Sequence, residues 1–122
     1  MSDKILLVED EHQIAKFISR GLQREGYQVI TAENGLDALN KLGQQEFDLV
    51  VTDILMPKMD GFTLTREIRS SERTKDLPVV VVTSMESEED KRRGLEVGAN
   101  AYLIKSSFDQ KNLIETIERL LS

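Results

Sequence analysis

The sequence predicts an α/β fold in which a parallel β-sheet has helices on both faces. Short apolar runs alternate five times with longer segments of helical periodicity. These runs begin near residues 4, 27, 47, 78 and 101, so successive starts lie 23, 20, 31 and 23 residues apart. Each interval has room for a helical, right-handed crossover between parallel strands. We see no repeat or linker, and we expect a single domain over residues 1–122.

The first half of the chain is expected to contribute three strands and two helices. Residues 5–8 form an apolar run typical of a buried strand. The following helix should end near Gly26, and its inward stripe comprises Ile14, Phe17, Ile18 and Leu22. A β-rich run at 27–31 comes next. Asn34 can then cap a second helix, and the buried side of that helix comprises Leu36, Leu39 and Leu42. The third strand occupies 47–52, which is apolar and β-branched.

The next three elements are a helix, a strand and a weakly amphipathic helix. The helix should cover 62–70, with Leu64 and Ile68 facing inward. Four consecutive valines at 79–82 indicate a buried strand. Ser87 and Asp90 have the spacing of a capping box, so they should begin a helix whose few apolar residues are Leu95 and Val97.

The chain is expected to end with a fifth strand and a strongly amphipathic helix. The strand occupies 101–104. The helix should be capped by Asp109 or Ser107. Its apolar stripe is the clearest in the chain and comprises Leu113, Ile114, Ile117, Leu120 and Leu121.

Composition excludes several classes of protein. The formal net charge of −6 disfavours direct binding to nucleic acid, and the most basic run, residues 91–93, is expected to be the solvated face of a helix. The absence of cysteine excludes disulfides and zinc–thiolate sites, and it fits the cytoplasm. The chain shows no signal peptide and no apolar run near the roughly 20 residues that span a bilayer. We therefore expect a cytoplasmic protein with no membrane partner.

Polar, phosphate-competent side chains follow four of the predicted strands. Glu9 and Asp10 follow the first, Asp53 the third, Thr83 the fourth and Lys105 the fifth. In a parallel sheet all these ends lie on the same edge. With the flavodoxin-like strand order 2-1-3-4-5, strands one and three are neighbours at the point where a ligand crevice opens. The three acids should therefore meet there.

Three acids this close together are expected to bind a cation that offsets their negative charge. Three close carboxylates raise one another's pKa, and either a divalent metal or the ammonium of Lys105 can relieve the repulsion. The candidate metal ligands are all oxygens, which favours Mg²⁺, with Mn²⁺ as a second fit, over zinc. Mg²⁺ commonly serves phosphate chemistry.

The same residues can support phosphoryl transfer. Asp53 can act as the nucleophile that forms an acyl phosphate, Lys105 can neutralise phosphoryl oxygens, and the Thr83 hydroxyl can donate a hydrogen bond. Each residue alone also has a structural interpretation: Asp53 as a turn former, Thr83 as a strand residue and Lys105 as a solvated lysine. The coincidence of these groups on one edge favours the functional interpretation.

Over essentially its whole length the sequence resembles a response-regulator receiver domain of the CheY-like kind. The most specific match is the Asp-to-Gly stretch that contains Met56-Pro57. The matching motifs are Val8-Glu9-Asp10-Glu11, Asp53-Ile54-Leu55-Met56-Pro57-Lys58-Met59-Asp60-Gly61, Val82-Thr83-Ser84 and Gly98-Ala99-Asn100-Ala101-Tyr102-Leu103-Ile104-Lys105.

The resemblance implies a site and its ligands. Asp53 would accept a phosphoryl group from a sensor histidine kinase or phosphotransfer protein. Asp10 and Asp53 would bind Mg²⁺ together with the backbone carbonyl of Leu55, while Glu9 would act mainly through water. Thr83 and Lys105 would contact the phosphoryl oxygens.

The resemblance also implies a switch. Movement of Thr83 and an inward turn of Tyr102 would remodel the face formed by helix four, strand five and helix five. That face would bind a downstream target or output domain, or a second copy in a phosphorylation-dependent homodimer. Such a protein is not a conventional enzyme, since it catalyses only its own phosphorylation and dephosphorylation.

Two features distinguish this chain within the resemblance. The family usually has proline after the lysine, whereas Lys105 is followed by Ser106-Ser107-Phe108. Leu55 and Met85, two residues after Asp53 and Thr83, are apolar and cannot orient an attacking water, so we expect a long-lived aspartyl phosphate.

Three alternatives stay open at the level of the sequence. A phosphohydrolase would commonly carry a second acid at the position of Leu55. A flavodoxin-like nucleotide or flavin binder would need a glycine-rich loop where Glu9, Asp10 and Glu11 stand. The third alternative is a binding module of the same fold that works without phosphorylation.

Overall fold

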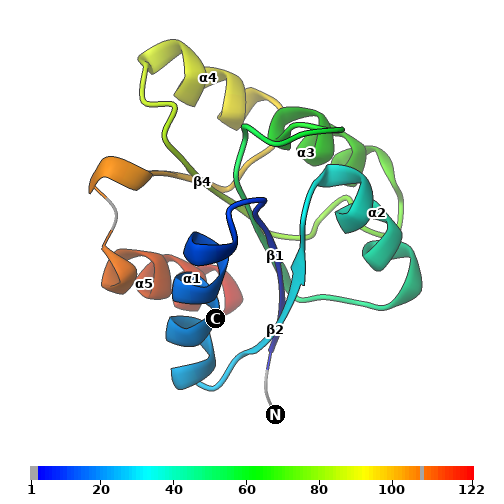
Figure 1. Cartoon of the computed structure of the whole chain (residues 1–122). Helices are drawn as coiled ribbons and strands as arrows, with labels where there is room; N and C mark the ends of the chain where they lie inside the picture. The colour runs from blue at the N-terminus through cyan, green and yellow to red at the C-terminus, as the bar shows by residue number, and fades with distance from the viewer. Residues whose placement is uncertain (1–2, 108) are drawn as a thin grey trace.

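A computed structural model describes residues 3–107 and 109–122, which form a parallel β-sheet between two layers of helices (Figure 1). The strand order β2-β1-β3-β4-β5 confirms the predicted flavodoxin-like (βα)5 topology. The strands are β1 (Lys4–Val8), β2 (Gln28–Ala32), β3 (Leu49–Thr52), β4 (Val79–Thr83) and β5 (Ala101–Ile104). The helices are α1 (His12–Arg24), α2 (Gly35–Gln44), α3 (Gly61–Ser70), α4 (Glu88–Glu96) and α5 (Gln110–Leu121), and a 3₁₀ turn, η1 (Lys105–Ser107), follows β5.

The central strands are apolar throughout because both of their faces are covered. Along β1, Ile5 and Leu7 pack in the core under α1 and α5, whereas Leu6 and Val8 pack under α2 and α3. All residues of β3 and β4 are buried in the same way. Buried strands of this kind have continuous apolar runs, as in the sequence, while the edge strands β2 and β5 are only partly covered.

Three helix starts have the caps that the sequence predicts. The Asn34 side chain accepts a hydrogen bond from the backbone N–H of Asp37 at 2.9 Å. Ser87 accepts one from the N–H of Asp90 at 3.0 Å, and Asp109 caps α5. These side chains satisfy N–H groups that have no partner within the helix.

Two apolar residues that were expected to face the core, Phe17 and Leu36, are instead exposed, and so is Leu95, one of the few apolar residues of α4. Phe17, Leu36 and Leu95 have 55%, 50% and 55% of their surface exposed. In each case the adjacent residue is buried in its place, and these neighbours are Ile18, Gly35 and Gly94. Successive side chains point about 100° apart around a helix, so a broad apolar stripe leaves its outer member in solvent.

A network of side-chain hydrogen bonds lies at the edge of the sheet opposite the polar strand ends. Arg69 of α3 donates hydrogen bonds to the carbonyls of Leu77 and Gly98 and to Asn100 Oδ1. Asn100 in turn pairs with both backbone groups of Val79 at 2.8 Å. This group, which we call the Arg69 anchor, fastens the α4–β5 turn to α3 and to the start of β4.

Candidate functional site

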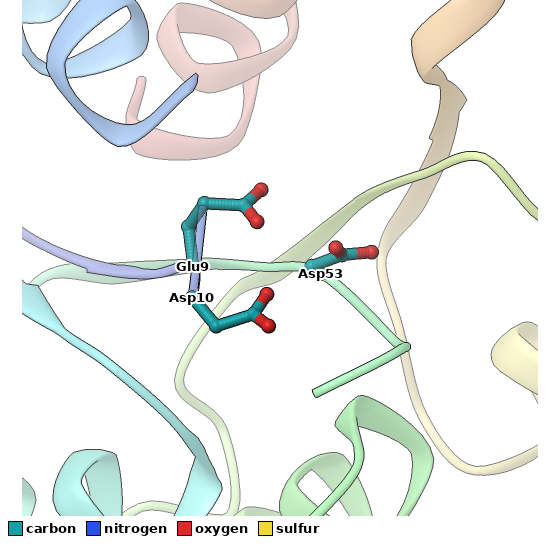
Figure 2. A group of neighbouring side chains, drawn as sticks. All are labelled: Glu9, Asp10 and Asp53. Carbon is teal, nitrogen blue, oxygen red and sulfur yellow. The ribbon is translucent and has the colours of Figure 1, made fainter. Parts of the chain in front are cut away.

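The three predicted acids meet at the carboxyl edge of the sheet. Strands β1 and β3 pair directly, with Val8 opposite Thr52, so the residues that follow them are neighbours. Carboxylate oxygens of Glu9, Asp10 and Asp53 lie within 4.8 Å of one another. Figure 2 shows Glu9 and Asp10, from the end of β1, extending toward the space beside Asp53. Glu9 and Asp53 are buried.

Lys105 reaches this group of acids from the end of β5. Its Nζ lies 2.9 Å from Asp53 Oδ2 and 2.9 Å from Glu9 Oε1. A third carboxylate, that of Glu11, lies 3.5 Å away. The ammonium is thus shared among several acids, and it cannot neutralise all of them.

The electrostatics of the site show the remaining excess of negative charge. The pKa of Glu9 is raised to about 7, because burial and, to a smaller extent, the charge of Asp53 together outweigh the lowering effect of Lys105. Burial lowers the pKa of Lys105, but its hydrogen bonds to Asp53 and Glu9 outweigh this and leave the pKa above its usual value. The cluster contains only oxygen ligands and too little positive charge, which fits Mg²⁺.

The β3–α3 loop holds Asp53 in place. Asp53 Oδ1 accepts a hydrogen bond from the N–H of Ile54 at 2.6 Å. Asp60 caps α3 through the N–H of Thr63. A Cβ on Gly61 would lie 2.2 Å from the carbonyl oxygen of Asp53, so only glycine lets the loop fold back this closely. The Asp60-Gly61 pair therefore shapes the site as well as the turn.

Thr83 and Tyr102 are linked through one loop residue. Thr83 is buried at the end of β4, and its Oγ1 accepts a hydrogen bond from the N–H of Met85 at 3.3 Å. The Tyr102 hydroxyl donates to the carbonyl of Met85 at 2.7 Å, and its ring packs against Gly94 of α4. Burial is the main cause that raises the pKa of Tyr102 to about 12, so this hydroxyl stays protonated and can donate.

Sequence reasoning missed one contact at the rim of the site. Ser106 Oγ donates a hydrogen bond to Glu86 Oε2 at 3.1 Å and joins the β4–α4 loop to the turn that carries Lys105. These residues are 20 positions apart, and no pattern in the sequence pairs them. Phe108, in the same predicted loop, lies outside the described residues. The expected role of the Leu55 carbonyl stays a prediction, and the Leu55 side chain is exposed.

A sheet of this topology with acids and a lysine at its carboxyl edge defines a class of α/β proteins with a phosphate-competent site. The profile of the response regulator receiver domain matches residues 5–118. The chain therefore belongs to the response regulator receiver domain family, which confirms the resemblance seen in the sequence.

Known proteins resemble the chain over nearly its full length. It is 40% identical to a gliding motility regulatory protein of Myxococcus xanthus over 96% of the chain and 15% of that protein. It is 36% identical to the transcriptional regulatory protein PcoR of Escherichia coli over 97% of the chain and 51% of PcoR. The chain thus spans about half or less of these curated relatives.

Solved structures show the same likeness. The chemotaxis protein CheY4 of Vibrio cholerae is 36% identical, with a TM-score of 0.92 and coverage of 99% of this chain and 100% of that chain. The receiver domain of the sensor histidine kinase PA1611 of Pseudomonas aeruginosa is 30% identical, with a TM-score of 0.90 and coverage of 99% and 98%. That structure has a magnesium ion coordinated in its active site cleft.

Family membership settles the general class of function. Receiver domains are signalling modules of two-component systems, not conventional enzymes, and they interact with histidine kinases and downstream targets. Because relatives include transcriptional regulators, the absence of direct nucleic-acid binding stays a prediction. In the described part of the chain no helix is both long and apolar enough to cross a membrane, and the cytoplasmic location also stays a prediction.

Proposed function

We propose that residues 1–122 act as one phosphoacceptor switch in which Asp53 is the phosphorylated residue. The observation that carries the proposal is the convergence of three carboxylates and Lys105 at one edge of the sheet. Asp53 is the member of this group that contacts Lys105 and lies at the end of the central strand β3. The donor is a phosphohistidine on a sensor kinase or phosphotransfer protein.

In the transfer, an Asp53 carboxylate oxygen attacks phosphorus in line with the leaving imidazole nitrogen. An O–P bond forms, the P–N bond breaks, and its electron pair returns to the imidazole. Lys105, which pairs with the Asp53 carboxylate before the transfer, then pairs with the phosphoryl oxygens. Glu9, Asp10, Asp53 and the Leu55 carbonyl would hold Mg²⁺, which supplies further neutralisation of those oxygens when bound.

The switch follows from the contacts of Thr83. If the Thr83 side chain moves toward a phosphoryl oxygen to which its hydroxyl donates, its oxygen moves away from the N–H of Met85, and the loss of that hydrogen bond changes the β4–α4 loop. The Tyr102 hydroxyl bonds to that same loop residue and so carries the change to the face formed by α4, β5 and α5. A partner that binds the altered face shifts the population toward it. That partner is a downstream target, an output domain or a second copy of the chain.

The test is intact mass after incubation with acetyl phosphate, with and without Mg²⁺. We expect a Mg²⁺-dependent gain of one phosphoryl group in the wild type and in the control Asp76→Asn, whose carboxylate is exposed. Asp53→Asn should gain none. A wild type that stays unmodified while circular dichroism shows an intact fold would favour a binding module that works without phosphorylation.

A further inference from the structure

The contact between Ser106 and Glu86 joins the two loops that carry the proposed phosphoryl-binding side chains. Ser106 directly follows Lys105, and Glu86 is the third residue after Thr83. The hydrogen bond of 3.1 Å therefore connects the loop of one phosphoryl contact to the turn of the other. In the receiver domains that the sequence resembles, proline commonly stands where Ser106 stands.

The residue after Lys105 is held differently by a serine than by a proline. A proline fixes its own φ, which a serine does not. Here η1 continues directly from β5, and the Ser106 hydroxyl reaches an acceptor on the neighbouring loop. The Tyr102 hydroxyl of β5 already bonds to the β4–α4 loop at Met85. The Ser106 hydroxyl adds a second hydrogen bond to the same loop, next to Lys105. The acceptor is a carboxylate, which strengthens the hydrogen bond, but both side chains are exposed, so competition with water keeps its contribution modest.

We propose that Ser106 and Glu86 form a latch that positions Lys105 and Thr83 relative to each other, and this inference rests on the proposed function. Both are positioning residues, since neither contacts the acids of the site in this structure. With the latch broken, both loops sample more conformations, and a smaller fraction of molecules has both phosphoryl contacts in place. The apparent rate of phosphorylation falls with that fraction. A single exposed hydrogen bond corresponds to a loss of about two- to fivefold.

The experiment combines phosphorylation kinetics with amide hydrogen exchange. Initial rates of phosphorylation by acetyl phosphate at saturating Mg²⁺ are measured for Ser106→Ala, Glu86→Ala and the double variant. Each single variant should be about two- to fivefold slower, and the double variant should be no slower than either. Ser106→Thr keeps the hydroxyl and should be phosphorylated at the wild-type rate. Glu88→Ala removes a nearby exposed carboxylate outside the latch and should match the wild type.

Amide exchange of residues 84–87 in the unphosphorylated protein provides the second measurement. It should be faster in Ser106→Ala and Glu86→Ala than in the wild type and in Ser106→Thr. Unchanged exchange, additive losses in the double variant, or no rescue by threonine would overturn the latch. A wild type that takes no phosphoryl group would overturn the proposed function and the positioning role together, and exchange would still decide whether the hydrogen bond orders the loop.

Discussion

Replacement of Lys105 by methionine removes the cation of the site and leaves its aliphatic stem. The Lys105 side chain is 16% exposed, and its partners Glu9 and Asp53 are 2% and 5% exposed. The stem lines a small apolar pocket with Ile14, Phe17, Ile18 and Val82, and methionine can fill this space. The variant therefore tests the charge of Lys105 with little change in packing.

The expected decrease in the free energy of unfolding of Lys105→Met has two parts. Asp53 loses a charged hydrogen bond, which costs about 1.5–3 kcal/mol. Glu9 loses its cation, but it can take up a proton because its pKa is already about 7. One pH unit above that pKa, protonation costs about 1.4 kcal/mol, so this part is limited to about 1.4 kcal/mol near pH 8 and vanishes near pH 6. The free energy of unfolding should therefore fall by about 3–4 kcal/mol near pH 8 and by about 1.4 kcal/mol less near pH 6.

The direction in which stability changes with pH follows from the pKa of Glu9 in the folded state. It lies above the ordinary value of 4.5, so the folded state binds the proton more tightly and loses stability as pH rises from 4.5 toward about 7. Removal of Lys105 raises this pKa further and extends the loss to higher pH. Unfolding in urea, followed by circular dichroism with EDTA at about pH 6 and about pH 8, measures both values.

The control is Lys111→Met. Lys111 is 79% exposed and 4.0 Å from Glu115, so its loss should cost less than about 0.5 kcal/mol at either pH. Added Mg²⁺ should stabilise Lys105→Met more than the wild type, because in the variant Mg²⁺ does not compete with the Lys105 ammonium for the carboxylates. Equal stability of Lys105→Met and the wild type near pH 8, or a larger loss near pH 6, would refute the reasoning.

Three further predictions concern the loops around Asp53. Lys58 has a φ of 70°, which a lysine adopts at a cost, so Lys58→Asn should increase the free energy of unfolding by about 0.5–1 kcal/mol and raise the urea midpoint, and a lower midpoint would contradict this. Gly61→Ala should lower stability by about 1–3 kcal/mol because its Cβ would meet the Asp53 carbonyl, and an unchanged midpoint would show that the loop can relax. The aspartyl phosphate should persist for minutes, because the apolar Leu55 and Met85 cannot orient water, and a mass-based half-life of seconds would exclude this explanation.

Much of the fold could be predicted because its periodicities and caps are local. The starts of β1 and β5 fall at the expected residues, while β3 begins two residues later than expected. Phe47, which precedes it, is buried without being part of the strand. The width of the buried helical face could not be predicted from periodicity alone, so Phe17 and Leu36 were expected in the core although both are exposed.

The candidate site could be predicted only as far as topology determines it. Strand order brings Glu9 and Asp53 to one edge whatever their rotamers, so their proximity follows from the sequence pattern. The Ser106–Glu86 contact and the Arg69 anchor depend on side-chain conformations across loops that are far apart in sequence. No local pattern encodes such contacts.

The Arg69 anchor also has a consequence for the movement of α4 in the proposed switch. The buried residue of this helix is Gly94, which packs against the Tyr102 ring, and the neighbouring Arg93 lies 4.2 Å from the centre of the Phe62 ring, so the packing of α4 is concentrated toward its carboxyl end. Its carboxyl end is fastened by the bonds of Arg69 to Gly98 and Asn100, whereas its amino end follows the loop that carries Thr83. In the proposed switch, a displacement of that loop should therefore tilt α4 about its anchored carboxyl end, and the largest movement should occur at the amino end of the helix, next to the phosphate-competent edge.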